Sequence, residues 1–395
     1  MKILHVIPSL AAVRGGPGQA ALELVKALRA CNVEAEIAAT NDNGPGLLDV
    51  PLCRKSDYQG APVWFFPRFS PAVSYLREYA FSALFSRWLL RGISGYDLLH
   101  VHGIFSYTCS MAMLMARLKK VPYLVRPNGM LCAWSLKQGR LKKQIYLDLF
   151  ERANLDRAGA LEFTSSQEHE EARVLNLRPQ SFILPYGLTP SMPLADAPLR
   201  LKQFLKIPGN EPVILFMSRL HHKKGLEYLI PALGRLKERP FRFIIAGSGS
   251  KKYEAKIKRL LEKEGIYSRT HILGYVQGEA KQLLLQGADL FALTSHSESF
   301  GLAVLEALAA GLPVLLTPGV PLASLIKKEG LGFVAEMEVG EIADTIKRCL
   351  DNPQGLKEMG GRGREVVRRE YNWEAIAGKL SRIYAAVLNR EDLPQ

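Results

Sequence analysis

Short apolar runs alternate with amphipathic stretches along almost the whole chain, a pattern typical of strands that alternate with helices. In the first half, the strand-like runs occupy residues 3–7, 35–39, 63–66, 98–101, 123–125 and 161–164. In the second half, they occupy residues 213–217, 241–246, 271–273, 289–294 and 314–316. Because such alternation favours parallel sheets with helical crossovers, we expect an α/β fold.

The stretch of residues 185–212 interrupts this rhythm, because several prolines are spread through it. A chain of 395 residues is also too long for one ordinary hydrophobic core. We therefore predict two domains, residues 1–190 and 191–372, followed by a helical segment at residues 373–395. Paired α/β domains usually bind ligands between them, beyond the carboxyl ends of their strands, so candidate sites should lie on loops that follow strands.

Composition narrows the class of protein further. Hydrophobic residues make up 48% of the chain, yet no apolar stretch approaches about 18 residues, so we expect no membrane span. The five cysteines are scattered and lack the paired spacing of a metal site. They are Cys31, Cys53, Cys109, Cys132 and Cys349. We expect a protein of the reduced cytoplasm, and the N-terminal apolar run is too short for a secretory signal.

The net charge of +14 indicates an acidic partner or an acidic surface. Nucleic acid is disfavoured, because the sequence has no recognition-helix pattern, zinc-finger spacing or regular interleaving of aromatic and basic residues. Phosphorylated small substrates and the anionic face of a membrane fit better, and Lys142 and Lys143 are candidate contacts for an acceptor or a membrane surface. A basic surface that serves only solubility is the alternative for much of the excess charge.

The most informative stretch is residues 298–306, which begins and ends with a glutamate and leads from a strand-like run into a predicted helix. The first turn of a helix leaves backbone amides without partners, so these amides could bind a phosphate. The amides concerned are those of Phe300, Gly301 and Leu302. Phosphate would repel Glu298 and Glu306, which are better suited to sugar or ribose hydroxyls. The alternative is a capped helix with two solvated glutamates.

A second loop, at residues 218–225, follows the strand-like run at residues 213–217 and places Arg219 and Lys224 between a strand and a helix. Arginine offers a planar fork of donors and lysine a point charge, a combination suited to a diphosphate that becomes a leaving group. An exposed basic turn is the alternative, since such loops are common.

Three loops in the first half also follow predicted strands. Gly15 and Gly16 would let a backbone approach a ligand closely, but the spacing of a dinucleotide-binding loop is missing, so NAD is disfavoured. His102, before Gly103, could be a neutral hydrogen-bonding group, a proton carrier or a structural histidine. Asn128 could add a polar contact to an acceptor, or belong only to a turn.

Several motifs are absent from the sequence. There is no Asp-x-Asp, so a metal ion held to a diphosphate by paired aspartates is not indicated, and we expect neither a metal nor a cofactor. The G-x-S-x-G, Walker A and H-E-x-x-H motifs are also missing. These absences disfavour many hydrolases and kinases.

Taken together, these motifs resemble the retaining glycosyltransferases of family 4, the glycosyl transferases group 1 family. The residues that carry the resemblance are Gly15, Gly16, His102, Arg219, Lys224, Gly225, Gly247, Gly249, Gly274, Val276, Glu298 and Glu306. The resemblance implies the GT-B fold, two Rossmann-like α/β/α domains that face each other across a deep cleft. It also implies that the first domain binds the acceptor, the second binds a nucleotide sugar, and the last helix, at residues 373–388, packs back on the first domain.

The resemblance further implies roles for individual residues. The catalytic candidates are Glu298, His102, Arg219 and Lys224. The donor-binding candidates are Gly16, Arg219, Lys224, Val276, Glu298, Phe300, Gly301, Leu302 and Glu306. Arg219 and Lys224 would hold the diphosphate, Glu298 the transferred sugar, Glu306 the ribose and Val276 the base. With no evident carboxylate nucleophile, a same-face substitution assisted by the departing phosphate fits retention better than a double displacement.

The expected activity is therefore a retaining, metal-independent transfer of the hexosyltransferase type, from a nucleotide-diphosphate sugar to a glycan or lipid-linked acceptor. Cell-surface polysaccharide biosynthesis is the expected setting, in the cytoplasm, with an anionic membrane surface on the inner face of the plasma membrane as a further partner. Two alternatives stay open. A sugar-nucleotide epimerase on the same fold would release an epimerised sugar without any acceptor. A non-catalytic nucleotide-sugar binding module would be stabilised by nucleotide without turnover.

Overall fold

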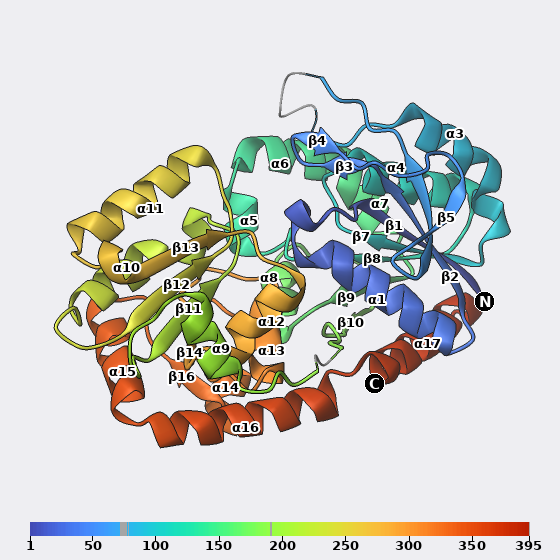
Figure 1. Ribbon diagram of the computed structural model, residues 1–395. Coiled ribbons are helices and arrows are strands. Elements are labelled where there is room, and N and C mark those ends of the chain that lie inside the picture. The colour runs from blue at the N-terminus through green and yellow to red at the C-terminus, as the bar shows by residue number, and fades with distance from the viewer. Residues whose placement is uncertain (72–76, 78, 190–191, 395) are drawn as a thin grey trace. The chain divides into compact units, whose positions relative to one another are not determined.

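The computed structural model describes residues 1–71, 77, 79–189 and 192–394. Its contacts divide the chain into two compact units. Unit 1 comprises Met1–Gly187 and Trp373–Gln395, and unit 2 comprises Leu188–Asn372. The predicted boundary, between residues 190 and 191, lies outside the described residues. Each unit has a sheet flanked by helices (Figure 1).

The described part of unit 1 contains an eight-stranded sheet in the order β10-β9-β8-β7-β1-β2-β6-β5. Its strands are β1 (Lys2–Ser9), β2 (Glu34–Thr40), β5 (Lys55–Tyr58), β6 (Ala61–Phe66), β7 (Leu98–His102), β8 (Tyr123–Arg126), β9 (Ala160–Phe163) and β10 (Ser181–Ile183). All neighbours are parallel except β5 and β6. The chain winds outward from β1 on one side and from β7 on the other, so the topological switch point lies between β1 and β7.

Helices cover both faces of this sheet. They are α1 (Gly16–Ala30), α3 (Ala83–Gly92), α4 (Tyr107–Lys119), α5 (Ala133–Lys137), α6 (Arg140–Tyr146), α7 (Arg152–Leu155), α8 (Ser166–Arg173) and α17 (Trp373–Asn389), with the 3₁₀ helices η1 (Ala12–Arg14) and η2 (Ile93–Gly95) and the π-helix η3 (Leu147–Glu151). Side chains of a strand point alternately to its two faces. Ile3 accordingly packs in the core with α1 and α17, whereas Leu4 packs in the core with α3 and α4. A small pair, β3 (Asp42–Asn43) and β4 (Gly46–Leu47), lies apart from the main sheet.

The last helix, α17, belongs to unit 1 and packs against α1, at the other end of the sequence (Figure 1). Leu380 and Tyr384, four residues apart on one face of α17, are completely buried. At the entry to α17, the Trp373 ring lies so close to Gly187 that a Cβ atom at Gly187 would overlap it. The return of the chain to unit 1 therefore depends on a small residue at position 187.

The described part of unit 2 contains a six-stranded parallel sheet in the order β13-β12-β11-β14-β15-β16, the doubly wound order of a Rossmann fold. Its strands are β11 (Val213–Met217), β12 (Arg242–Ala246), β13 (Thr270–Gly274), β14 (Leu290–Leu293), β15 (Val314–Leu316) and β16 (Gly332–Val334). Its helices are α9 (Ala197–Phe204), α10 (Leu226–Gly234), α11 (Lys251–Lys263), α12 (Gly278–Gly287), α13 (Leu302–Ala309), α14 (Ala323–Glu329), α15 (Val339–Asp351) and α16 (Pro353–Glu370), with η4 (His222–Lys224) and η5 (Tyr267–Arg269).

Each strand predicted from the sequence corresponds to a strand of the structure, but three strands of the two sheets have no predicted counterpart. These are β5, β10 and β16, which have four, three and three residues. β5 is largely polar, and β10 and β16 are only three residues long and partly exposed, so none of them stands out as a buried strand. No described helix combines the length and the apolar character that crossing a bilayer requires.

Candidate functional site

The switch point of unit 2 lies between β11 and β14, and the loops after both strands carry predicted site residues. Lys224 ends η4 after β11, and Glu298 lies between β14 and α13. Gly225 lets the two loops approach, since it has φ +68° and a Cβ atom there would overlap the carbonyl oxygen of Thr294. The Thr294 hydroxyl donates to the Gly225 carbonyl oxygen over 2.9 Å.

Lys224 and Glu298 form the central contact of this site. The Lys224 Nζ atom lies 2.5 Å from Glu298 Oε1, which also accepts a hydrogen bond from the Ser295 hydroxyl over 2.7 Å. The two side chains are only 11% and 10% exposed. Burial alone would raise the pKa of Glu298, but the nearby Lys224 ammonium and these hydrogen bonds lower it, so the group is a carboxylate. Lys224 and Glu298 thus form a nearly buried ion pair beyond the C-terminal ends of the strands.

The other predicted donor-binding residues of unit 2 surround the loops at this edge. Arg219 is exposed directly after β11, and Val276 is half-buried after β13. The helix α13 begins at Leu302, and its N-cap is Gly301, with φ +99° and no side chain to cap the first turn. Glu306 lies one turn further on, where its Oε1 accepts from Lys281 Nζ over 2.7 Å. Both predicted glutamates are therefore paired with a lysine.

Phe300, the remaining predicted residue of unit 2, is 3% exposed. Its ring centroid lies 6.1 Å from that of Tyr371. Its side chain is therefore part of the core, and only its backbone is suited to the role expected from the sequence.

In unit 1, Gly16 begins α1 directly after the glycine N-cap Gly15, which has φ +91°. The preceding turn is held by Arg14, whose Nε and Nη2 atoms donate to the Asp42 carboxylate over 2.6 and 2.9 Å. The buried Arg68 guanidinium contacts the same carboxylate. Two arginines thus fix the carboxylate that holds the glycine-containing loop.

His102 ends β7 at the switch point of unit 1 and belongs to a buried cluster of three imidazoles. Its Nε2 atom lies 2.9 Å from Nδ1 of His5, on the neighbouring strand β1. The ring of His100 stacks on that of His102 with centroids 4.2 Å apart. Burial, and after it neighbouring cationic groups, lowers the pKa of all three, for His5 to about 3, so the rings are neutral at neutral pH.

The cluster continues into further buried polar groups from three other elements. The hydroxyl of Tyr384, on α17, lies 2.7 Å from His100 Nδ1 and 3.5 Å from His5 Nε2. On β9, Glu162 Oε2 lies 2.9 Å from His100 Nε2, and Glu162 also pairs with Arg126 of β8. The network therefore joins four strands to the C-terminal helix.

Asn128, the predicted acceptor contact, follows β8 with φ +55°. Its Oδ1 accepts a hydrogen bond from the Tyr186 hydroxyl over 2.7 Å. Glu168, on α8, accepts from the backbone amide of Gly129. The turn is thus held on both sides at the same edge of the sheet as His102.

The structure brings Lys224 and Glu298 into contact in unit 2 and places His102, Gly16 and Asn128 at one edge of the unit 1 sheet. The sequence predictions missed several partners of these residues. They are His5, Asp42, Arg126, Glu162, Lys281 and Tyr384. Most of these residues reach their partners through the strand order and register, which the sequence pattern does not give. His5, for example, lies beside His100 because β1 pairs with β7.

Comparison with protein families gives the same division of the chain. The family described as glycosyl transferases group 1 matches residues 199–366, and the glycosyl transferase 4-like domain matches residues 15–187. The chain belongs to the family 4-like glycosyltransferases. This confirms the resemblance drawn from the sequence motifs.

Curated members of this glycosyltransferase group show distant similarity. The chain is 25% identical over 334 residues to the phosphatidylinositol N-acetylglucosaminyltransferase gpi3 subunit of Schizosaccharomyces pombe, covering 82% of this chain and 69% of the relative. It is 30% identical over 188 residues to an uncharacterized glycosyltransferase of Methanocaldococcus jannaschii, covering 47% of this chain and 48% of the relative. For most of the relatives compared, the match spans about half of their length.

Solved structures of glycosyltransferases share the fold. Sucrose-phosphate synthase from Thermosynechococcus elongatus is similar with a TM-score of 0.77 and 20% identity, over 99% of this chain and all of that one. Anabaena HepE in complex with UDP-glucose has a TM-score of 0.76 and 19% identity, over 98% and 100% of the two chains. The predicted GT-B fold is therefore confirmed for this family 4-like chain.

Proposed function

We propose that this chain transfers a sugar from a nucleotide-diphosphate sugar to an acceptor hydroxyl, with retention of the anomeric configuration and without a metal ion. The contact of Lys224 with Glu298 at the switch point of unit 2 carries the proposal. It supplies a cation for a departing diphosphate and a carboxylate for sugar hydroxyls within one site. HepE, a structural neighbour, is described in complex with UDP-glucose.

Each residue has a role in this proposal that follows from its place. Lys224 and Arg219 bind the diphosphate, with the uncapped amides at the start of α13 as further donors. Glu298 accepts from hydroxyls of the transferred sugar, and Glu306 accepts from the ribose. With Glu298 and Glu306 assigned to hydroxyl groups, no carboxylate nucleophile is evident among these site residues. Substitution on the face of the departing phosphate therefore fits retention.

The roles of the other site residues complete the proposal. Gly16 is assigned to the donor through its backbone, and Val276 to the base. His102 lies beside the reacting sugar and the acceptor, and Asn128 contacts the acceptor. The acceptor is a glycan or a lipid-linked sugar of a cell-surface polysaccharide.

The test is transfer from a panel of nucleotide-diphosphate sugars to candidate acceptors, with the anomeric configuration of the product read by NMR. Lys224→Ala and Glu298→Ala should each abolish transfer. Arg242→Ala is the matched control, because Arg242 is paired with Glu211 over 2.5 Å beside the amino ends of the unit 2 strands. Wild-type transfer by either site variant would refute the assignment. An epimerised donor without acceptor, or donor binding without turnover, would instead favour the epimerase or the binding module.

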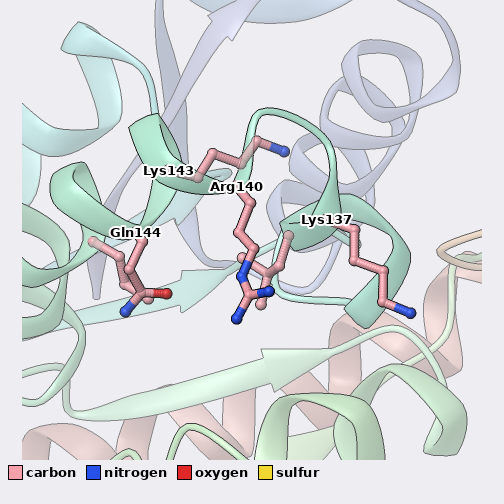
Figure 2. Close-up of a pocket in the computed structure, with 6 residues that line it drawn as sticks. Lys137, Arg140, Lys143 and Gln144 are labelled. Carbon is pink, nitrogen blue, oxygen red and sulfur yellow. The ribbon is translucent and has the colours of Figure 1, made fainter.

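We also propose that unit 1 binds an anionic membrane surface through α6 and the adjoining η3. Leu141, Ile145 and Leu149 recur every four residues and are 74%, 50% and 67% exposed, so they form one outward apolar stripe. Two exposed cations, Arg140 and Lys142, lie on the same helix, and Figure 2 shows Lys137, Arg140 and Lys143 around a pocket lined by residues of α5, α6 and η3. An apolar stripe bordered by cations is complementary to anionic lipid headgroups and the acyl chains beneath them.

Sedimentation with vesicles tests this membrane proposal. The chain should bind vesicles of phosphatidylcholine and phosphatidylglycerol, and bind weakly to phosphatidylcholine alone. The double variant Arg140→Gln/Lys142→Gln should bind the vesicles more weakly by about 2 kcal/mol, at about 1 kcal/mol for each cation removed. The control is the same change at Lys252 and Lys258 of α11, a lysine-rich helix whose Ile257 and Leu261 are buried. Equal binding by the two double variants would refute the assignment.

A further inference from the structure

We propose that a one-directional chain of hydrogen bonds through unit 1 fixes the tautomer of His102 and leaves its Nδ1 atom as a hydrogen-bond acceptor. The hydrogen-bonded members of the chain are His100, Tyr384, His5 and His102, and the carboxylate of Glu162 lies in close contact with His100 at its start. His5, His100 and Tyr384 are then positioning residues for His102. The benefit to catalysis rests on the proposed function, whereas the assignment of protons does not.

The chain begins at the carboxylate of Glu162. Arg126 contacts Glu162 Oε1 and keeps this buried carboxylate ionised, because a guanidinium does not give up its proton. Glu162 Oε2 lies 2.9 Å from His100 Nε2, a close electrostatic contact in which neither atom makes a hydrogen bond of good geometry. A nitrogen lone pair at this distance would repel the carboxylate oxygen, so His100 Nε2 carries the proton. The Nδ1 atom of the neutral His100 ring is therefore an acceptor.

The remaining steps follow from counting donors. The Tyr384 hydroxyl lies 2.7 Å from the accepting Nδ1 of His100, so it donates its single proton there. The Tyr384 oxygen can then only accept from His5 Nε2, 3.5 Å away, which is the longest step of the chain. His5 Nδ1 is consequently an acceptor, and His102 Nε2, 2.9 Å away, donates to it. His102 is left with a bare Nδ1.

A metal site is the other arrangement that three imidazoles allow, and their nearest ligand atoms all lie within 4.8 Å of one another. Two nitrogens bound to one tetrahedral zinc at about 2.0–2.1 Å would be about 3.3 Å apart. The 2.9 Å between His5 and His102 is a hydrogen-bond distance instead. Both nitrogens of His100 also face other partners, Tyr384 and Glu162. The geometry therefore favours hydrogen bonds over metal ligation.

The position of His102 gives the chain a use. Of the three imidazoles, His5 and His100 are fully buried and His102 is 3% exposed, at the end of β7 before Gly103. Because its ring is neutral, His102 acts through the proton it carries and the lone pair it presents. A bare Nδ1 accepts a hydrogen bond from a hydroxyl of the sugar or the acceptor. The buried chain thus determines which partner His102 can bind.

Nitrogen-15 NMR of the full chain labelled at histidine tests the assignment. Long-range proton–nitrogen correlations distinguish the two neutral tautomers, and the signals of the eight histidines can be assigned by single substitutions. We expect His5, His100 and His102 all to carry their proton on Nε2. An Nδ1 proton on any of the three in the wild-type chain would overturn the proposal.

Glu162→Gln is the decisive variant. Arg126 should take the amide oxygen of the new side chain, which leaves an NH₂ group facing His100 Nε2. That nitrogen must then accept, so every donor in the chain reverses and all three histidines should move to the Nδ1 tautomer. Tyr123→Phe is the control, because it removes another buried hydroxyl, one that donates to the Asn154 carbonyl oxygen outside the chain. A folded Glu162→Gln protein with an unchanged His102 would overturn the proposal.

If Glu162→Gln does not fold, Tyr384→Phe tests the proposal instead, because it removes the hydroxyl that connects His100 to His5 in the series of hydrogen bonds. The nitrogen shifts of His100 Nδ1 and His5 Nε2 should move, and unchanged shifts would again overturn the proposal. In a folded Glu162→Gln protein we expect kcat/KM for sugar transfer to fall at least tenfold. Reversed tautomers with unchanged kcat/KM would remove the functional role of His102. If the wild-type protein shows the assigned tautomers but transfers no sugar, the proposed function is refuted and the tautomer assignment stands.

Discussion

The three buried histidines of unit 1 predict a steep loss of stability in mild acid. In the unfolded chain, each imidazole takes up a proton as the pH falls below about 6.5. In folded unit 1, burial lowers the pKa of His5 to about 3 and those of His100 and His102 well below 6.5, so the rings stay neutral. The unfolded state then binds more protons, and stability falls as the pH falls.

The magnitude follows from linkage. One pH unit below the unfolded pKa, a histidine that stays neutral in the folded state costs about 1.4 kcal/mol. Three such residues therefore lower the free energy of unfolding of unit 1 by about 4 kcal/mol between pH 7.5 and 5.5. Burial raises the pKa values of Glu151 and Glu168, so these carboxylates offset part of the loss if they take up protons within this window. A histidine variant isolates the effect of one ring.

Urea unfolding of wild type and His5→Asn across this pH range measures the difference. We expect the His5→Asn protein to lose about 1.4 kcal/mol less than the wild type between pH 7.5 and 5.5, whatever its stability at pH 7.5. His169→Asn is the control, because His169 lies on α8 outside the cluster. Parallel pH profiles for wild type and His5→Asn would show that His5 gains its proton in the folded protein, and the reasoning would fail.

Three further predictions concern the two units separately. Lys224→Ala and Glu298→Ala should each cost about 3 kcal/mol, since each leaves a buried charge unpaired, and the double variant should cost less than the sum; additive losses in urea unfolding would show that the pair is not coupled. Gly225→Ala should lower the melting temperature and weaken binding of the donor, because a Cβ atom overlaps the Thr294 carbonyl and the residue has φ +68°; wild-type values in a thermal-shift titration would refute this. Leu380→Ala should cost about 2–5 kcal/mol and speed hydrogen exchange in α17, which mass spectrometry measures; unchanged exchange would contradict the packing of that helix on unit 1.

The sequence was sufficient for the alternation of strands and helices, because buried parallel strands read as apolar runs of a few residues. It was not sufficient for β10 and β16, which are only three residues long and have partly exposed side chains. Their place in the sheets comes from pairing with β9 and β15, and a local pattern cannot report it.

The candidate site shows the same limit at the level of single residues. Lys224 and Glu298 were identified from loops that follow strands, since those loops meet at the carboxyl edge of a parallel sheet. Their contact was not predicted, because it requires β11 and β14 to be neighbours although they lie more than 70 residues apart. His102 was identified for the same reason, whereas its connection to Tyr384 spans most of the chain and depends on where the last helix returns.

That return gives α17 two roles, which substitutions can separate. Leu380 and Tyr384 are one turn apart on the same buried face of α17, so the same packing in the core of unit 1 positions both of them. Leu380 offers only apolar contacts, whereas the Tyr384 hydroxyl contacts His100 and His5. Leu380→Ala should therefore lower stability and leave the histidine tautomers unchanged in the folded fraction. Tyr384→Phe keeps the ring and should change the imidazole nitrogen shifts with a smaller loss of stability. Because the two variants differ in which property they change, they distinguish a helix that only covers the core from one that also sets the state of His102.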